Sequence, residues 1–307
     1  MKTAFLFPGQ GSQYVGMGKE IYERFEKSKE IFNIANKELN FKISDICFNG
    51  PEEVLKSTEN AQPSILTVSI AMFEVVKDVI KPDVVAGHSL GEFSALVASE
   101  SISFSDAIKV VRKRGEFMKS ASKGTMAAIL NLSKEKVEEL CKEGSKSGLV
   151  TPANFNSPGQ IVISGEKSGV EKVCALAKSN GGRGIPLVVS GPFHSPLMKS
   201  ACDKLEKEIA KIKVISPNIN FMANVTGDYV KEGTTIKDLL IKQVISPVLW
   251  EDTINKMINN GVDLFIEVGP GKVLSGLVKR IKKDARVFNI ENIKTLEEFV
   301  SFCKNSS

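Results

Sequence analysis

The sequence predicts an α/β protein with a mostly parallel sheet. Short apolar stretches alternate with helical patterns, and those at 3–7, 83–86 and 262–268 have the length and composition of buried strands. The chain has 307 residues, of which 42% are hydrophobic, so it can bury a large core as one large domain or two modest ones. A long apolar helix at 63–80 precedes the second strand, and we expect it to be buried against the sheet.

Residues 123–189 follow a different pattern, which has the order βαββαβ. The expected elements are a strand at 126–130, a helix at 133–143, strands at 150–154 and 160–164, a helix at 170–179 and a strand at 184–188. That order is typical of a ferredoxin-like unit. We therefore expect residues 1–122 and 190–307 to form the large domain, with 123–189 as an inserted small domain that borders a cleft.

Residues 87–91 read Gly-His-Ser-Leu-Gly, the G-x-S-x-G pattern of a nucleophile elbow. The pattern follows an apolar strand and precedes a helix-like segment at 92–98, which is the context that an elbow requires. A strand that turns sharply into a helix crowds its backbone, so only residues without a Cβ fit on either side of the serine. Ser89 is therefore a candidate nucleophile at a helix N-terminus, and the alternative is a glycine-punctuated turn with an incidental serine.

The chain has only two histidines that could activate Ser89. His88 is adjacent to Ser89, and neighbouring side chains on an extended backbone point to opposite sides. His194, in Gly-Pro-Phe-His-Ser-Pro at 191–196, gives the order serine then histidine that elbow enzymes have. A structural histidine in a proline-rich loop is the alternative. Because no other residue competes for the role, we predict that His194 is the base.

A glycine-rich loop follows the first strand, in the segment Phe-Leu-Phe-Pro-Gly-Gln-Gly-Ser-Gln at 5–13. Loops of this kind present backbone N–H groups, as an oxyanion hole does, although an ordinary strand-to-helix turn would have the same composition. The segment Gly-Pro-Gly-Lys at 269–272 lacks the spacer of a phosphate-binding loop and the Ser or Thr after the lysine. We therefore do not predict a nucleotide site there.

Arg114 interrupts the apolar stripe of a predicted helix at 105–120. The stripe consists of Ala107, Val110, Val111, Phe117 and Met118. At about 100° per residue, Arg114 falls within roughly 20° of the centre of this stripe, so its guanidinium faces the interior. A buried guanidinium needs an anionic partner. That partner is either a buried Asp or Glu, in a structural ion pair, or a carboxylate of the substrate.

Composition excludes several classes of protein. The formal net charge is +5, from 41 basic and 36 acidic residues, and the basic residues are dispersed without interleaved aromatics, so we expect no nucleic-acid partner. Five cysteines without a CxxC pair indicate free thiols in a reducing compartment. No leader precedes the first strand and no run is long enough to span a bilayer, so we expect a cytoplasmic protein without a membrane partner.

Taken together, these motifs resemble those of the malonyl-CoA:acyl carrier protein transacylase family, which loads malonyl groups for fatty-acid synthesis. The resemblance spans essentially the whole chain. Besides the Arg114 helix, it rests on FLFPGQGSQ at 5–13, GHSLGE at 87–92, NFNSPGQIVISG at 154–165, PFHSPLM at 192–198, QVISPVLW at 243–250 and EVGPGKVLSGL at 267–277. The fold that it implies is an α/β-hydrolase-like core with a ferredoxin-like insert.

The resemblance also implies a reaction. Ser89 would take the malonyl group from malonyl-CoA as an ester, with His194 as general base and then general acid. The phosphopantetheine thiol of an acidic acyl carrier protein would then accept the group. No metal and no bound cofactor is implied, because malonyl-CoA is a substrate that brings its own activated thioester.

Further site residues follow from the same resemblance. The backbone N–H groups of Gln10 and Leu90 would form the oxyanion hole, and Arg114 would pair with the malonyl carboxylate. The main-chain carbonyl of Gln243 would orient His194. The remaining residues assigned to the substrate site are Phe193, Met118, Asn156 and His88.

Three other functions share parts of this pattern. A generic serine esterase or thioesterase has the elbow and the histidine but does not need an interior arginine. An acyltransferase of a polyketide pathway would share all the motifs. A non-catalytic protein that docks the carrier would keep the fold, although it would have no need for Ser89, His194 and Arg114 together.

Overall fold

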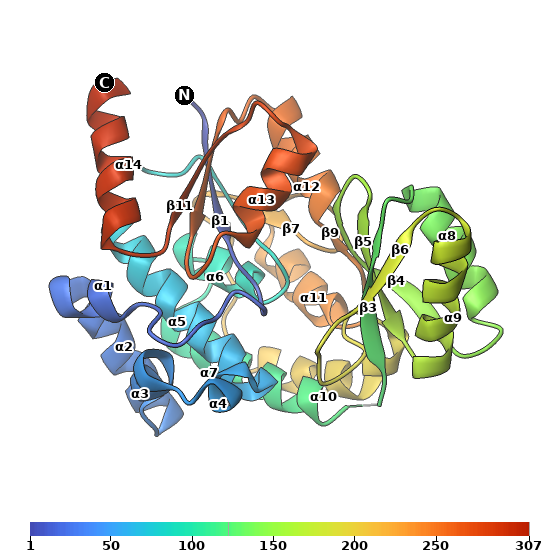
Figure 1. The fold of residues 1–307 in the computed structure, drawn as a ribbon. Helices are drawn as coiled ribbons and strands as arrows, with labels where there is room; N and C mark the ends of the chain where they lie inside the picture. The colour runs from blue at the N-terminus through green and yellow to red at the C-terminus, as the bar shows by residue number, and fades with distance from the viewer. Residues whose placement is uncertain (122, 307) are drawn as a thin grey trace.

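The computed structural model describes residues 1–121 and 123–306, which form two β-sheets with helices packed around them (Figure 1). The large sheet has the strand order β11-β10-β1-β2-β7-β8. Its strands are β1 (Thr3–Phe7), β2 (Val84–Gly87), β7 (Asn220–Ala223), β8 (Asp228–Val230), β10 (Leu264–Val268) and β11 (Arg286–Ile290). All neighbouring pairs are parallel except β7 and β8. The predicted α/β class and its three predicted strands, now β1, β2 and β10, are confirmed.

The central strands of the large sheet, β1, β2 and β10, are buried on both faces, which explains why they are nearly continuous apolar runs. In β1, Phe5 and Phe7 pack into the cluster on one face, whereas Ala4 and Leu6 pack into the cluster on the other. All four side chains have an exposed fraction of 0%. This alternation follows from the two-residue repeat of a strand.

Helices cover the two faces of this sheet and its ends (Figure 1). They are α1 (Lys19–Arg24), α2 (Glu26–Leu39), α3 (Ile43–Asn49), α4 (Glu52–Lys56), α5 (Thr58–Val76), α6 (Gly91–Ala98), α7 (Phe104–Lys119), α10 (Lys199–Ile209), α11 (Gly233–Gln243), α12 (Trp250–Asn259), α13 (Val273–Ile281) and α14 (Ile293–Ser306). A 3₁₀ turn, η1 (Pro196–Met198), precedes α10. Within 1–121 and 123–306, no helix combines the length and apolarity needed to cross a bilayer.

The apolar helix expected at 63–80 begins and ends earlier in the sequence than predicted. It is α5, which begins at Thr58 and ends at Val76. The apolar run begins at Pro63, but the mostly polar residues before it belong to the same helix, so Pro63 lies inside α5. The predicted burial is correct, because the residues from Ala61 to Phe73 are all buried.

The small sheet has the strand order β6-β3-β5-β4-β9. Its elements are β3 (Thr125–Leu130), α8 (Lys134–Gly144), β4 (Val150–Ser157), β5 (Gln160–Gly165), α9 (Lys167–Ser179), β6 (Arg183–Pro186) and β9 (Val248–Leu249). The order βαββαβ predicted for 123–189 is therefore present, and these strands pair antiparallel. Figure 1 shows α8 and α9 on the outer face of this sheet.

The small sheet differs from the prediction in three respects. The strand expected at 150–154 is β4 and continues to Ser157. The last strand, expected at 184–188, is β6, which begins one residue earlier and ends at Pro186, although the Leu187 N–H still donates to the Met126 carbonyl of β3 at 2.9 Å. The edge strand β9 comes from outside 123–189 and pairs in parallel with β4, with Asn154 opposite Val248. The two sheets are thus linked through a segment that the sequence analysis did not assign to either.

Glu267 at the end of β10 holds the start of α13. Its carboxylate accepts hydrogen bonds from the backbone N–H groups of Leu274 and Ser275, at 3.0 and 2.7 Å, and from the Ser275 hydroxyl at 2.7 Å. Burial raises the pKa of Glu267 to about 7, and these hydrogen bonds act in the opposite direction. Glu267 therefore has a structural role as the anion at a helix N-terminus.

Candidate active site

The nucleophile elbow lies between β2 and α6. β2 ends at Gly87 and α6 begins at Gly91, so the predicted strand–turn–helix context is confirmed. Ser89 has a φ angle of 52°, in the left-handed region that side-chain-bearing residues rarely adopt. A Cβ on Gly87 would lie 1.8 Å from the carbonyl oxygen of Gly91, and one on Gly91 would lie 2.0 Å from that of Phe7. Close backbone contacts therefore require both glycines.

We expect the Gly91→Ala substitution to destabilise the protein by at least about 1–3 kcal/mol, because the new methyl group overlaps a backbone carbonyl that cannot move without shifting β1. Urea unfolding measures this loss. Gly276→Ala in α13 is the matched control, since its Cβ would meet no atom within 4 Å. It should raise stability by about 0.5–1 kcal/mol through helix propensity. Equal stability of the Gly91→Ala variant and the wild type would contradict the steric argument.

Ser89, His194 and Gln243 form a chain of hydrogen bonds. The Oγ atom of Ser89 lies 2.7 Å from Nε2 of His194, and Nδ1 of His194 lies 2.8 Å from the main-chain oxygen of Gln243. A carbonyl oxygen can only accept, so Nδ1 carries the proton and Nε2 is free to accept one from Ser89. His194, in the loop before η1, has a φ angle of 57°. The tertiary structure thus brings together three predicted residues from distant parts of the chain.

The environment of His194 favours its neutral form. Burial, together with the positive charge of Arg114, lowers the pKa of His194 to about 3, whereas the hydrogen bond to the Gln243 carbonyl acts in the opposite direction. The imidazole is therefore neutral at physiological pH and can accept a proton without first losing one. An imidazolium formed there is costly until the charge of Arg114 is balanced.

Arg114 faces the interior, as the helical stripe predicted. It has an exposed fraction of 1%, and burial lowers its pKa to about 10, which leaves it charged at neutral pH. Its guanidinium donates to Oε1 of Gln62 at 2.7 Å, to Oε1 of Gln243 at 2.9 Å and to Oγ of Ser89 at 3.1 Å. Among the described residues no carboxylate forms a direct ion pair with it, and its Nε has no partner. A direct structural ion pair is therefore not the reason for the buried arginine.

Gln10 and Leu90 lie at the ends of two adjacent strands. Phe7 of β1 is opposite Gly87 of β2, and the His88 N–H donates to the Phe7 carbonyl at 3.0 Å. The loop after β1 therefore runs beside the elbow. Within the described part of the chain, no hydrogen-bond acceptor is found for the backbone N–H of either Gln10 or Leu90. Both N–H groups are available to bind an oxyanion.

A cavity of about 550 Å³ opens onto Ser89. Six of the other predicted site residues line it: Gln10, His88, Arg114, Met118, Phe193 and His194. The remaining three, Leu90, Asn156 and Gln243, lie outside the lining. Asn156 acts on the elbow indirectly, because its Oδ1 lies 2.9 Å from Nε2 of His88.

Several residues of the site were missed by the sequence analysis. Gln62 and Asn154 line the cavity. Asn224 accepts a hydrogen bond from the Ser89 N–H, and Glu92 accepts one from the backbone N–H of Asn224. Gln62 could have been noticed as a polar side chain at the start of a long apolar run. Glu92 lies in the first turn of a helix, where acidic residues are common, and nothing in the sequence shows that it is buried.

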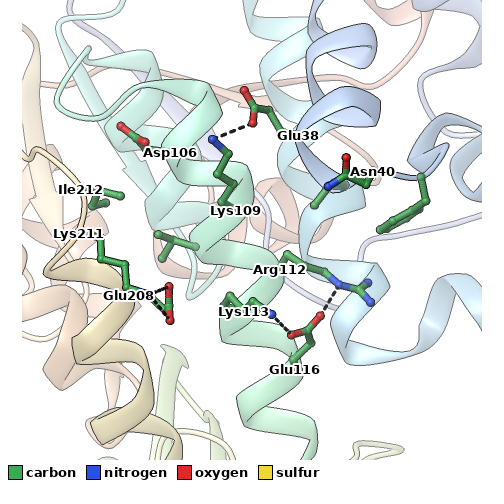
Figure 2. A pocket seen from close by; sticks show the side chains of 13 residues that line it. Glu38, Asn40, Asp106, Lys109, Arg112, Lys113, Glu116, Glu208, Lys211 and Ile212 are labelled. Carbon is green, nitrogen blue, oxygen red and sulfur yellow. Dashed lines mark hydrogen bonds and ion pairs between the residues drawn. The ribbon is translucent and has the colours of Figure 1, made fainter.

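A second cavity, of about 530 Å³, lies between α2, α7 and α10 (Figure 2). It is lined by the charged face of α7, and most of its charged side chains are paired with one another. Lys109 bonds Glu38 at 2.7 Å, and Lys113 bonds Glu116 at 2.9 Å. None of the predicted site residues lies there. The cavity at Ser89 is therefore the candidate active site.

The fold and this site are those expected of a class of enzymes that transfer acyl groups. In the described part of the chain, no group of three or more His, Cys, Asp and Glu residues could hold a metal ion. Residues 4–298 match the model of the acyl transferase domain family. The chain belongs to this family and is an acyltransferase.

Individual relatives are similar over the full length. The malonyl CoA-acyl carrier protein transacylase of Bacillus subtilis (strain 168) is 48% identical over 312 aligned residues, which cover 100% of this chain and 98% of that protein. The crystal structure of the transacylase of the same name from Clostridium perfringens ATCC 13124 has a TM-score of 0.97 at 45% identity, with coverage of 100% and 98%. A malonyl-transacylase in complex with its type II PKS acyl-carrier protein has a TM-score of 0.95 at 36% identity, with coverage of 98% and 100%.

Proposed function

We propose that this enzyme transfers the malonyl group of malonyl-CoA to the phosphopantetheine thiol of an acyl carrier protein, through a malonyl ester on Ser89. The observation that carries the proposal is the buried guanidinium of Arg114, which lies 3.1 Å from Oγ of Ser89 and makes no direct ion pair with any carboxylate of the described residues. An acyl group on Ser89 would need a free carboxylate to pair with it. The relatives named malonyl CoA-acyl carrier protein transacylase, which are similar over the whole chain, support the same substrate.

In the first half-reaction, Oγ of Ser89 attacks the thioester carbon of malonyl-CoA, and its proton passes to Nε2 of His194. The carbonyl oxygen becomes an oxyanion, which the N–H groups of Gln10 and Leu90 bind. When the carbon–sulfur bond breaks, His194 returns the proton to the departing CoA thiol. The malonyl carboxylate meanwhile pairs with Arg114, which reduces the cost of an imidazolium at His194.

The second half-reaction runs the same steps in reverse. The carrier's thiol gives its proton to His194 and attacks the malonyl ester, and the ester carbon–oxygen bond breaks. His194 then returns the proton to Ser89, which regenerates the enzyme. No metal or bound cofactor takes part in this proposal. A related malonyl-transacylase in complex with an acyl-carrier protein supports the choice of acceptor. An acidic carrier would also be attracted to an enzyme of net charge +5.

The remaining residues shape the cavity in this proposal. Phe193 and Met118, with exposed fractions of 7% and 2%, form apolar walls that leave room for a small acyl group. His88 and Asn156 hold each other beside the elbow and form a polar wall. The main-chain carbonyl of Gln243 orients the imidazole of His194, a role that a carboxylate has in many serine enzymes.

We also propose a division into domains. Residues 1–122 and 190–307 would form an α/β-hydrolase-like core, and 123–189 an inserted ferredoxin-like domain. The strand order β6-β3-β5-β4 supports the second assignment, because it is the 4-1-3-2 order of an antiparallel βαββαβ sheet. The insertion lies between Ser89 and His194 in the chain, so the cleft between the domains would contain the substrate.

The proposed function is tested by the mass of the intact protein after brief incubation with malonyl-CoA. We expect the mass of one malonyl group, and its loss when a phosphopantetheinylated carrier protein is added. The chain has five cysteines, and a thiol could also carry an acyl group, so peptide mapping must distinguish an ester on Ser89 from a thioester. A malonyl group on any cysteine, or turnover of p-nitrophenyl esters with no malonyl loading, would overturn the proposal.

A further inference from the structure

Two amide side chains hold the backbone of the elbow around Ser89. Asn224, which follows β7, donates from Nδ2 to the Gly87 carbonyl at 2.7 Å and accepts from the Ser89 N–H at 2.7 Å. Gln243, at the end of α11, donates from Nε2 to the Ser89 carbonyl at 2.9 Å. The left-handed conformation of Ser89 is strained, and strained conformations persist only where surrounding groups hold them. These two residues provide that support.

The orientation of the Gln243 amide is determined by its neighbours. Its Oε1 faces Arg114, which can only donate, and its Nε2 faces the Ser89 carbonyl, which can only accept. If the amide were turned over, its NH₂ group would face the donor Arg114, and its oxygen would face the Ser89 carbonyl, which is also an acceptor. The correct orientation therefore links the elbow to Arg114, whereas the main-chain carbonyl of the same residue orients His194.

Glu92 anchors both of these amide residues. Its Oε1 accepts from the backbone N–H of Asn224 at 3.1 Å, and its Oε2 accepts from Nε2 of Gln243. The side chain has an exposed fraction of 1% and is not part of the cavity lining, and the described partners of Ser89 Oγ are His194 and Arg114. Burial raises the pKa of Glu92 to about 7, and the ionised carboxylate, which is the main form at pH 8, acts favourably on Arg114 across the Gln243 amide. One buried carboxylate thus fixes the two residues that hold the elbow and also interacts electrostatically with the buried guanidinium.

We propose that Glu92 is a positioning residue for acyl transfer. Through Asn224 and Gln243 it holds the elbow backbone around Ser89, and its carboxylate is the counter-charge of Arg114 in the free enzyme. The inference rests on the proposed function, because the step that it supports is acylation of Ser89. It predicts that Glu92 affects every acyl group, charged or uncharged, whereas Arg114 selects the charged one.

The test is the Glu92→Gln variant, which keeps the shape of the side chain. A carboxylate accepts from two donors, but an amide has one oxygen and one NH₂ group, so either Asn224 or Gln243 must face a donor. At pH 8, the single-turnover rate constant of acylation at saturating acyl-CoA should fall about 10- to 100-fold. The loss should be at least as large with acetyl-CoA as with malonyl-CoA, because acetyl has no carboxylate to balance Arg114.

The amplitude of the single-turnover reaction separates this role from a merely structural one. Amplitude counts folded sites, whereas the rate constant reports the geometry within each site. Glu267→Gln is the matched control, since Glu267 is also a buried glutamate that accepts from backbone N–H groups but lies outside the cavity. It should lower stability and leave the rate constant of acylation unchanged.

Two results would overturn the proposal once the wild type has been shown to load malonyl groups: an unchanged rate constant in Glu92→Gln, or a loss confined to malonyl-CoA. If Glu92→Gln does not fold, Gln243→Met carries the test, because it removes the amide link but keeps the carbonyl that orients His194. An unchanged rate of acetyl loading in that variant would be equally decisive against the proposal. Failure of the wild type to load malonyl would instead contradict the proposed function.

Discussion

Replacing His194 by Ala is expected to lower the rate of malonyl loading by about 10²–10⁴-fold, the usual contribution of general base assistance. The imidazole is 2.7 Å from Oγ of Ser89, and its proton is held on the far nitrogen by the Gln243 carbonyl. Because its pKa is lowered to about 3, essentially every molecule carries the neutral base at physiological pH. Removal of the ring therefore removes the acceptor for the Ser89 proton from the whole population.

Two comparisons make this prediction specific. Ser89→Ala should accumulate no malonyl ester at all, which defines the baseline. His88→Ala should lose less activity than His194→Ala, because the ring of His88 is directed to Asn156 and Trp250 instead of Oγ of Ser89. The measurement is the single-turnover rate with malonyl-CoA, followed by mass spectrometry. If His194→Ala lost less activity than His88→Ala, the assignment of His194 as the base would be wrong.

Replacing Arg114 by Ala should shift selectivity from malonyl-CoA toward acetyl-CoA by about 30- to 4000-fold. Without the guanidinium, the malonyl carboxylate would be desolvated and unpaired, at a cost of roughly 2–5 kcal/mol, and each 1.36 kcal/mol corresponds to a factor of ten. Acetyl never had that partner and does not bear the cost. The structure strengthens the argument, since the guanidinium lies in the cavity beside Ser89 and makes no direct ion pair within the described part of the chain.

The ratio of malonyl to acetyl loading in the folded variant measures this shift. Arg112→Ala is the matched control, because Arg112 lies on the same helix but bonds Glu116 and Asn60 outside the cavity. That variant should keep the ratio of the wild type. Arg114→Lys should rescue only part of the loss, since an ammonium cannot reproduce the planar fork of a guanidinium. Equal losses for malonyl and acetyl in Arg114→Ala would mean that Arg114 is structural.

Features that depend on adjacent residues could be predicted from the sequence. The strands β1, β2 and β10, the elbow and the interior position of Arg114 all follow from local periodicity or from glycine spacing. The order βαββαβ was also predicted correctly, although the ends of its last strand were not. Boundaries were less predictable because they depend on tertiary contacts, as the early start of α5 demonstrates.

By itself, the sequence determined which residues could carry the chemistry: one serine on an elbow, one usable histidine and one arginine on an apolar stripe. Only the tertiary structure decided what surrounds them. Gln62, Glu92, Asn224 and Gln243 come from separate helices and loops, and their contacts depend on packing between distant segments. Glu92 illustrates the physical reason: its sequence position fits a solvated first turn, and burial behind the elbow alone makes its carboxylate an anchor for the site.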